Sequence, residues 1–183
     1  MRAVVDRVNG TPGVTISATG GVGHALAFNS EITGTLDSDL EDDFSAVTNS
    51  AGNTPSINGY GNILIVQENN GHGCSTTACT NPDDNFGKSS TTHNGQSVRG
   101  GVITFDFATE VFLTSVDFFD IESSQGGYVE LVLFDNSIQT FNFFNVGDNG
   151  VGILEFGASG VNRVTSVNVV IDGSGAIDNL RGE

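Results

Sequence analysis

Short apolar runs recur along the chain, and several alternate with polar residues in the two-residue period of a β-strand. In segment 101–107 the alternation places Ile103, Phe105 and Phe107 on one side, which predicts a strand with one buried face. Segment 62–68 is almost wholly apolar, which predicts a central strand or one buried on both faces. The other predicted strands are 14–18, 24–29, 111–121, 128–134, 138–144, 151–156, 163–171 and 176–180.

Turn-forming sequences separate these runs, among them Ser-Gln-Gly-Gly, Gly-Asp-Asn-Gly and Asp-Gly-Ser-Gly. About ten short strands divided in this way are typical of an all-β protein, either an antiparallel β-sandwich or a jelly roll. No segment has a convincing helical period. The 183 residues predict one β-sandwich domain that covers 1–183.

Two long stretches, 31–61 and 69–100, contain few apolar residues. Loops of this length are uncommon in a compact domain unless something orders them. The second stretch contains Cys74 and Cys79, for which we predict a local disulfide formed in an oxidising compartment. A zinc site that adds His72 is an alternative, although zinc normally takes more Cys or His ligands close by.

The charge balance is strongly acidic, with 22 Asp and Glu against 6 Lys and Arg and a formal net charge of -16. This charge disfavours nucleic acid and anionic membrane surfaces as partners because their phosphates would be repelled. No apolar run is long enough to predict a membrane-spanning helix. Residues 1–9 lack the hydrophobic core of a signal peptide, so we do not expect a secretion signal there.

Many of the acidic residues lie beside Gly and Asn in predicted loops, where few basic side chains could balance them. A Ca²⁺ ion, which takes oxygen ligands in flexible geometry, would supply the missing positive charge. Asp37 and Asp39 are candidate ligands, since alternate acids can offer two carboxylates to one ion. The neighbouring acids at 41–43 are interpreted as a solvated loop.

Further candidate ligands lie near the cysteines and at strand ends. Asp83 and Asp84 follow Pro82, which restricts the backbone, and Asn85 beside them is a candidate ligand-binding residue. Asp120 ends a Phe-rich strand and either ligates a cation or marks the exit of the chain to solvent. Asp178 lies inside the last predicted strand, where a carboxylate is costly unless it is paired or metal-bound. It is therefore the foremost candidate.

The chain resembles a family of Ca²⁺-binding β-sandwich modules of secreted and cell-surface proteins. In general layout it is similar to jelly-roll carbohydrate-binding modules. The matching segments are 37–40, 62–68, 82–85, 101–107, 116–122 and 174–180. The resemblance implies a structural Ca²⁺ near Asp178, with ligands from Asp37 or Asp39, Glu68 and Asp84.

The chain departs from that family in two ways. The cysteine loop is not a general feature of such modules, and the chain has no Trp, the usual platform for a sugar ring. Tyr60, Tyr128 and exposed Phe residues are the candidate substitutes.

No nucleophile elbow, metal-hydrolase motif or phosphate-binding loop occurs, so a non-enzymatic function is expected. The prediction is a Ca²⁺-stabilised extracellular module that binds carbohydrate or polysaccharide at a cell surface. The alternative is a structural subunit that assembles with copies of itself into a Ca²⁺-dependent filament.

Overall fold

The computed structural model describes residues 3–5, 13–20, 25–31, 33–34, 40–41, 43–57, 59–66, 91–123 and 126–183. The strands are β1 (Ala3–Val5), β2 (Val14–Gly20), β3 (Ala25–Asn29), β4 (Ser45–Ala46), β5 (Asn62–Val66), β6 (Thr91–His93), β7 (Gln96–Val98), β8 (Gly101–Phe119), β9 (Gly126–Leu133), β10 (Ile138–Asn142), β11 (Gly150–Glu155), β12 (Val161–Asp172) and β13 (Ala176–Gly182).

The strands form one 11-stranded sheet with the order β10-β9-β12-β8-β13-β5-β3 along its main path, plus a separate β6–β7 hairpin. β2 and β11 also pair with β8, while β1 pairs with β2 and β4 with β11. All pairs are antiparallel except β11–β4. The predicted all-β, antiparallel class is therefore confirmed. No helix in the described part of the chain is long and apolar enough to cross a membrane.

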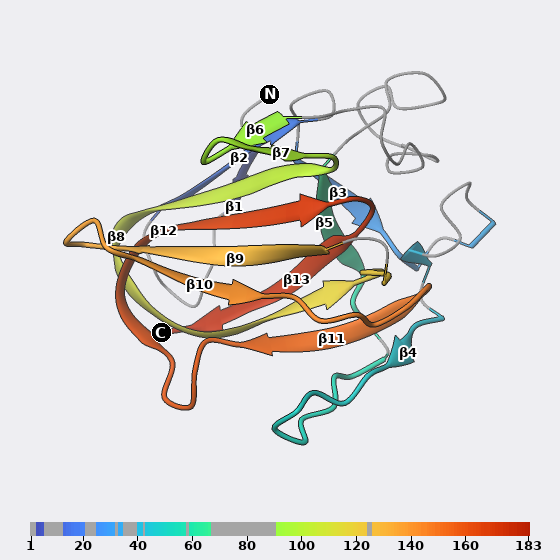
Figure 1. Ribbon diagram of the computed structural model, residues 1–183. Coiled ribbons are helices and arrows are strands. Elements are labelled where there is room, and N and C mark those ends of the chain that lie inside the picture. The colour runs from blue at the N-terminus through green and yellow to red at the C-terminus, as the bar shows by residue number, and fades with distance from the viewer. Residues whose placement is uncertain are drawn as a thin grey trace.

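The 19-residue strand β8 joins two parts of this sheet and curves around one side of the molecule (Figure 1). Its first part, 101–107, pairs with β2 and β12. Its last part, 113–119, pairs with β13, and within it 115–119 also pairs with β11. The sequence predicts two strands here, but the exposed residues Ala108, Thr109 and Glu110 continue the strand instead of interrupting it.

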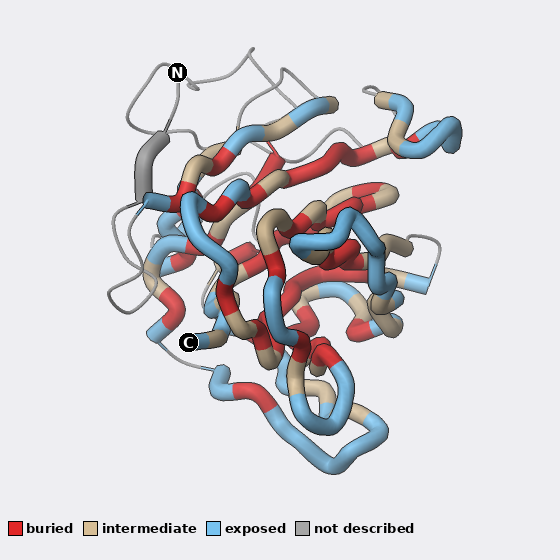
Figure 2. The backbone as a smooth tube through the Cα atoms, turned by 90° about the vertical axis from the view of Figure 1, so that its left-hand side faces the viewer, coloured by how far each residue is buried: buried red, intermediate tan, exposed pale blue. Residues whose placement is uncertain are grey.

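The main core lies between the two parts of the sheet. Ile103 and Phe105 from the first part of β8 belong to the same buried cluster as Val116 and Phe118 from its last part. Figure 2 shows the buried stretches gathered inside the molecule, with exposed segments around them. Alternating apolar side chains of both parts therefore fill one core, as a two-residue period requires.

A second cluster lies on the other face of the last part of β8. Phe119 packs there with Leu40, Phe44 and Tyr60 from the polar stretch 31–61. The ring centroids of Phe119 lie 4.8 Å from Phe44 and 4.7 Å from Tyr60. The described residues of this stretch are thus held to the sheet by a few apolar anchors.

The β6–β7 hairpin falls within the stretch predicted as a long loop, 69–100. Its turn is Asn94-Gly95, and both residues have positive φ, 49° and 81°. This is the conformation that an Asn-Gly hairpin turn requires. The dipeptide was the sequence signal for a hairpin that the pattern of apolar residues does not reveal.

Candidate functional site

A network of polar side chains covers the outer face of β9, β12 and the first part of β8. Glu130 of β9 alternates with Val129 and Leu131, which face the core, so its side chain projects from the opposite face. Only 6% of Glu130 is exposed. A carboxylate this buried requires hydrogen-bond donors around it.

Three side chains supply these donors. His93 Nε2 donates to Glu130 Oε2 at 2.7 Å, and Asn94 Nδ2 donates to Oε1 at 2.7 Å. Asn168 Nδ2 of β12 lies 3.5 Å from Oε2, and Thr104 Oγ1 of β8 donates to Asn168 Oδ1 at 3.0 Å. We call these five residues the Glu130 network.

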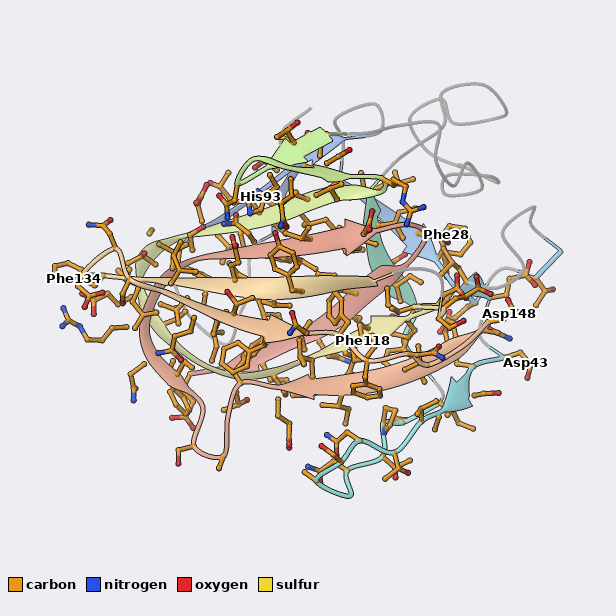
Figure 3. All side chains as sticks on the ribbon, in the orientation of Figure 1. Phe28, Asp43, His93, Phe118, Phe134 and Asp148 are labelled. Carbon is orange, nitrogen blue, oxygen red and sulfur yellow. The ribbon has the colours of Figure 1, made fainter. Side chains whose placement is uncertain are left out.

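The β6–β7 hairpin places His93 and Asn94 over the sheet, where Figure 3 shows His93 between the hairpin and the strands beneath it. Val98 at the end of β7 packs with Val102 and Val170 in a small apolar cluster. The Asn94-Gly95 turn directs two consecutive side chains to one carboxylate. The hairpin is therefore held by apolar contacts and by Glu130 together.

Tyr128 lies next to this network. It stands two residues before Glu130 on β9, on the same outer face, and packs against the Val98 cluster. Its ring centroid lies 6.4 Å from that of His93. Partial burial, followed by the negative charge of Glu130, raises the pKa of Tyr128. The predicted ligand-binding residue Tyr128 is thus part of a surface that combines a ring with fixed donors and acceptors.

A second polar group lies on the outer face of β13 and the last part of β8. It consists of Asp117, Asn179 and Arg181, and we call it the Asp117 cluster. Asp117 is 1% exposed and accepts two bonds of 2.6 Å from Arg181 Nη1 and Nη2. Asn179 Nδ2 donates to Asp117 Oδ2 at 3.0 Å. A bidentate guanidinium pair of this kind compensates the cost of burying a carboxylate.

The structure brings two predicted site residues to the Asp117 cluster, Asp178 and Tyr60. Asp178 is the cross-strand partner of Asp117. Burial is the main cause that raises the pKa of Asp178, and the charge of Asp117 raises it further. Arg181 bonds with Asp117, and among the described residues no basic side chain lies within 4.0 Å of the Asp178 carboxylate.

Tyr60 is 9% exposed, and its hydroxyl donates to the backbone oxygen of Ser56 at 2.6 Å. Burial, followed by the charge of Asp117, raises the pKa of Tyr60. Its ring packs edge-on against Phe119 in the second apolar cluster. In this arrangement the Tyr60 ring holds segment 43–57 on the sheet and presents no open face to a ligand.

Asp120 lies at a third place, directly after β8. It is 2% exposed and has a positive φ of 55°. Its Oδ1 accepts from the backbone N of Asn149 at 3.1 Å, and its Oδ2 accepts from Ser174 Oγ at 3.2 Å. Asn149 Nδ2 donates to the backbone oxygen of Asp43 at 2.8 Å, which joins the chain near Asp43 to the turn that contains Asp148 (Figure 3).

Asn149 Oδ1 is buried, and no described residue donates a hydrogen bond to it. The same residue, Asn149, donates its backbone N–H to the buried carboxylate of Asp120. Within the described ranges, however, no three His, Cys, Asp or Glu side chains converge as a metal-binding group. The described residues alone thus offer oxygen ligands singly and not as a complete Ca²⁺ cage, which takes six to eight oxygens.

The other predicted site residues lie outside the described residues. They are the metal-ligand candidates Asp37, Asp39, Glu68, Asp83 and Asp84, the ligand-binding candidate Asn85, and the disulfide candidates Cys74 and Cys79.

The sequence pattern does not reveal a site at His93, Asn94 and Glu130. These residues are far apart in the chain, and only the Asn94-Gly95 turn signalled the hairpin that brings them together. Comparisons with protein-family models, with curated proteins and with solved structures gave no significant match to this chain.

Proposed function

We propose that this chain is a non-catalytic β-sandwich module of jelly-roll type that binds neutral carbohydrate on the outer face around Glu130. The observation that carries the proposal is the position of Tyr128 beside a buried carboxylate held by His93 and Asn94. The single core between the two parts of the sheet supports the sandwich. A surface or secreted location follows from the resemblance and stays part of the proposal.

The chemistry of this face suits a sugar. A pyranose presents hydroxyl groups and apolar C–H faces, so a binding site needs oriented polar groups beside an aromatic ring. Glu130 holds one ring nitrogen of His93 and one amide hydrogen of Asn94, which leaves their other polar atoms in fixed positions. Because these groups are already oriented, binding costs less conformational entropy.

The face also selects against acidic glycans. Glu130 is an anion at the centre of the network, and the whole chain has a net charge of -16. A uronic acid or sulfated sugar would therefore be repelled at close range and over a distance. Neutral polysaccharides are the expected class of ligand.

The test titrates the chain with neutral and with uronic-acid oligosaccharides and measures binding by isothermal titration calorimetry. Tyr128→Ala is expected to weaken binding of a neutral glycan about tenfold, which corresponds to about 1.4 kcal/mol. Tyr60→Phe is the matched control, because Tyr60 lies beside the Asp117 cluster, and it should bind as the wild type does. Equal binding by Tyr128→Ala and wild type would place the glycan elsewhere, and no binding to any neutral glycan would overturn the proposal.

We also propose that Ca²⁺ stabilises the fold. Asp120 and the buried oxygen of Asn149 support a cation at the end of β8, where an oxygen without a donor would gain a partner. Asp178 is the second described candidate, because its carboxylate faces Asp117 with one arginine for two acids. The further ligands that we propose are those expected from the sequence, Asp37, Asp39, Glu68, Asp83 and Asp84.

The Ca²⁺ proposal is tested by thermal unfolding with EGTA and with CaCl2 at equal ionic strength. Ca²⁺ is expected to raise the Tm, because a ligand that binds only the folded state stabilises it by mass action. Asp120→Asn should lose most of this increase, while MgCl2 should give less of it. An identical Tm with EGTA and Ca²⁺ would remove the ion from the proposal.

A further inference from the structure

Among the described strands, β10 lies at the end of the sheet order and pairs with β9 on one side. At the two ends of this pairing, Leu133 N donates to Ser137 O and Phe143 N donates to Gly127 O. Hydrogen-bonded pairs in an antiparallel ladder recur at every second residue. The bonds to β9 therefore use residues 137, 139, 141 and 143, and the backbone groups of Ile138, Thr140 and Asn142 point away from it.

The sequence of this strand lacks the charged residues and prolines that commonly protect an open edge. Segment 136–147 contains no charged residue, although the chain as a whole has a net charge of -16. It also contains no Pro, and a Lys or Pro is the common means of blocking such an edge. Ile138, one of the three large exposed apolar residues in the described part of the chain, lies on this strand and is 52% exposed.

The open positions of β10 are also complementary to themselves. A two-fold axis midway between Thr140 and its copy would place these two residues opposite each other and Ile138 opposite Asn142 of the second copy. The backbone N–H and C=O groups of these residues point away from β9. Each facing pair can therefore exchange two backbone hydrogen bonds in regular register. Thr–Thr pairs across a strand are favourable, and no like charges would meet.

We propose that β10 is a dimerisation edge, at which two copies of this chain pair antiparallel into one continuous sheet. A second copy suits this edge because the uncharged strand has no charge with which to recognise an acidic or basic peptide. The same face is buried on both subunits, so the contact closes as a dimer and does not propagate into a filament.

Dimerisation would have a consequence for glycan binding, and this consequence rests on the proposed function. The two-fold axis of an antiparallel strand pair stands perpendicular to the sheet, so both Glu130 networks would lie on the same side. A dimer would then hold one polysaccharide at two points, which increases avidity without any new contact.

The test is sedimentation equilibrium of the full chain over a range of protein concentrations, without glycan. Wild type is expected to dimerise, more tightly at higher NaCl concentration because salt screens the repulsion between two acidic chains. Thr140→Pro removes an outward N–H that β9 does not use, and Thr140→Lys places like charges opposite each other. Both variants should weaken dimerisation at least tenfold. Thr92→Lys, an exposed strand residue of the hairpin, should dimerise as wild type does.

Circular dichroism melts of each variant separate a lost dimer from a lost fold. A wild type that stays monomeric at high concentration and high salt would overturn the proposal, and so would a folded Thr140→Pro variant that dimerises normally. Because the measurement contains no glycan, its outcome is independent of whether the Glu130 face binds sugar.

Discussion

At the scale of single residues, the Asp117 cluster and Asp178 together contain two neighbouring acids and one arginine, which pairs with only one of the two. Asp117 and Asp178 are cross-strand partners on the same face, and of these two acids Arg181 bonds with Asp117. Directly opposed like charges destabilise an antiparallel pair. Asp178 is therefore left with a raised pKa, for which burial is the main cause.

We predict that Asp178→Asn stabilises the protein at neutral pH in the presence of EGTA. Because the folded-state pKa of Asp178 is raised, its destabilising effect grows as the pH rises through that pKa and is absent below the unfolded value of about 3.9. The variant should have a Tm about 2–4 °C higher at pH 7 for each kcal/mol gained, and the same Tm as wild type near pH 3.

Asp106→Asn is the matched control, since Asp106 is an exposed acid on the same strand as Asp117. It should leave the Tm close to that of wild type at both pH values. A lower Tm for Asp178→Asn at pH 7 in EGTA would mean that the Asp178 carboxylate stabilises the fold through a contact other than a bound cation.

At the scale of elements, the β6–β7 hairpin depends on its turn. Gly95 has φ 81°, and a Cβ there would meet no atom within 4 Å. Any cost of a side chain at this position therefore comes from the backbone conformation alone, about 1–2 kcal/mol for an L-residue. The hairpin in turn positions His93 and Asn94 on Glu130.

We predict that Gly95→Ala loosens the hairpin while the sheet stays intact. Amide hydrogen exchange of residues 91–98 should become about tenfold faster, since tenfold corresponds to about 1.4 kcal/mol of local stability. Gly59→Ala is the control, because Gly59 also has a positive φ (77°) with no atom within 4 Å of a Cβ. It should leave exchange at 91–98 unchanged. Unchanged exchange in Gly95→Ala would show that the turn does not limit hairpin stability.

At the scale of the whole molecule, charge repulsion opposes folding. The net charge is -16, and the three described arginines, Arg99, Arg163 and Arg181, each already pair with an acid. Like charges spread over a compact surface destabilise it, and salt shortens the range of that repulsion.

We predict that NaCl raises the Tm between about 0.02 M and 0.3 M, because the Debye length falls below about 10 Å near 0.1 M. Differential scanning calorimetry checks this prediction. A decrease in Tm would indicate that the exposed ion pairs Arg99–Asp172 and Arg163–Glu110 contribute more than the general repulsion.

Much of the strand content was predictable from the sequence, because a two-residue alternation of apolar side chains requires one buried and one open face. The pattern failed at 108–110, where a stretch without a large apolar residue suggested a break in β8. It failed again at the hairpin, because its strands are too short and too exposed to leave an apolar period.

The sequence by itself determined the all-β class, the acidic surface and most strand positions, since these follow from local periodicity and composition. Only the tertiary structure decided which polar residues meet. Glu130, His93 and Asn94 converge because a hairpin folds over the sheet, and Tyr60 is buried because Phe44 and Phe119 pack against it. Such contacts join residues far apart in the chain, and no local pattern specifies them.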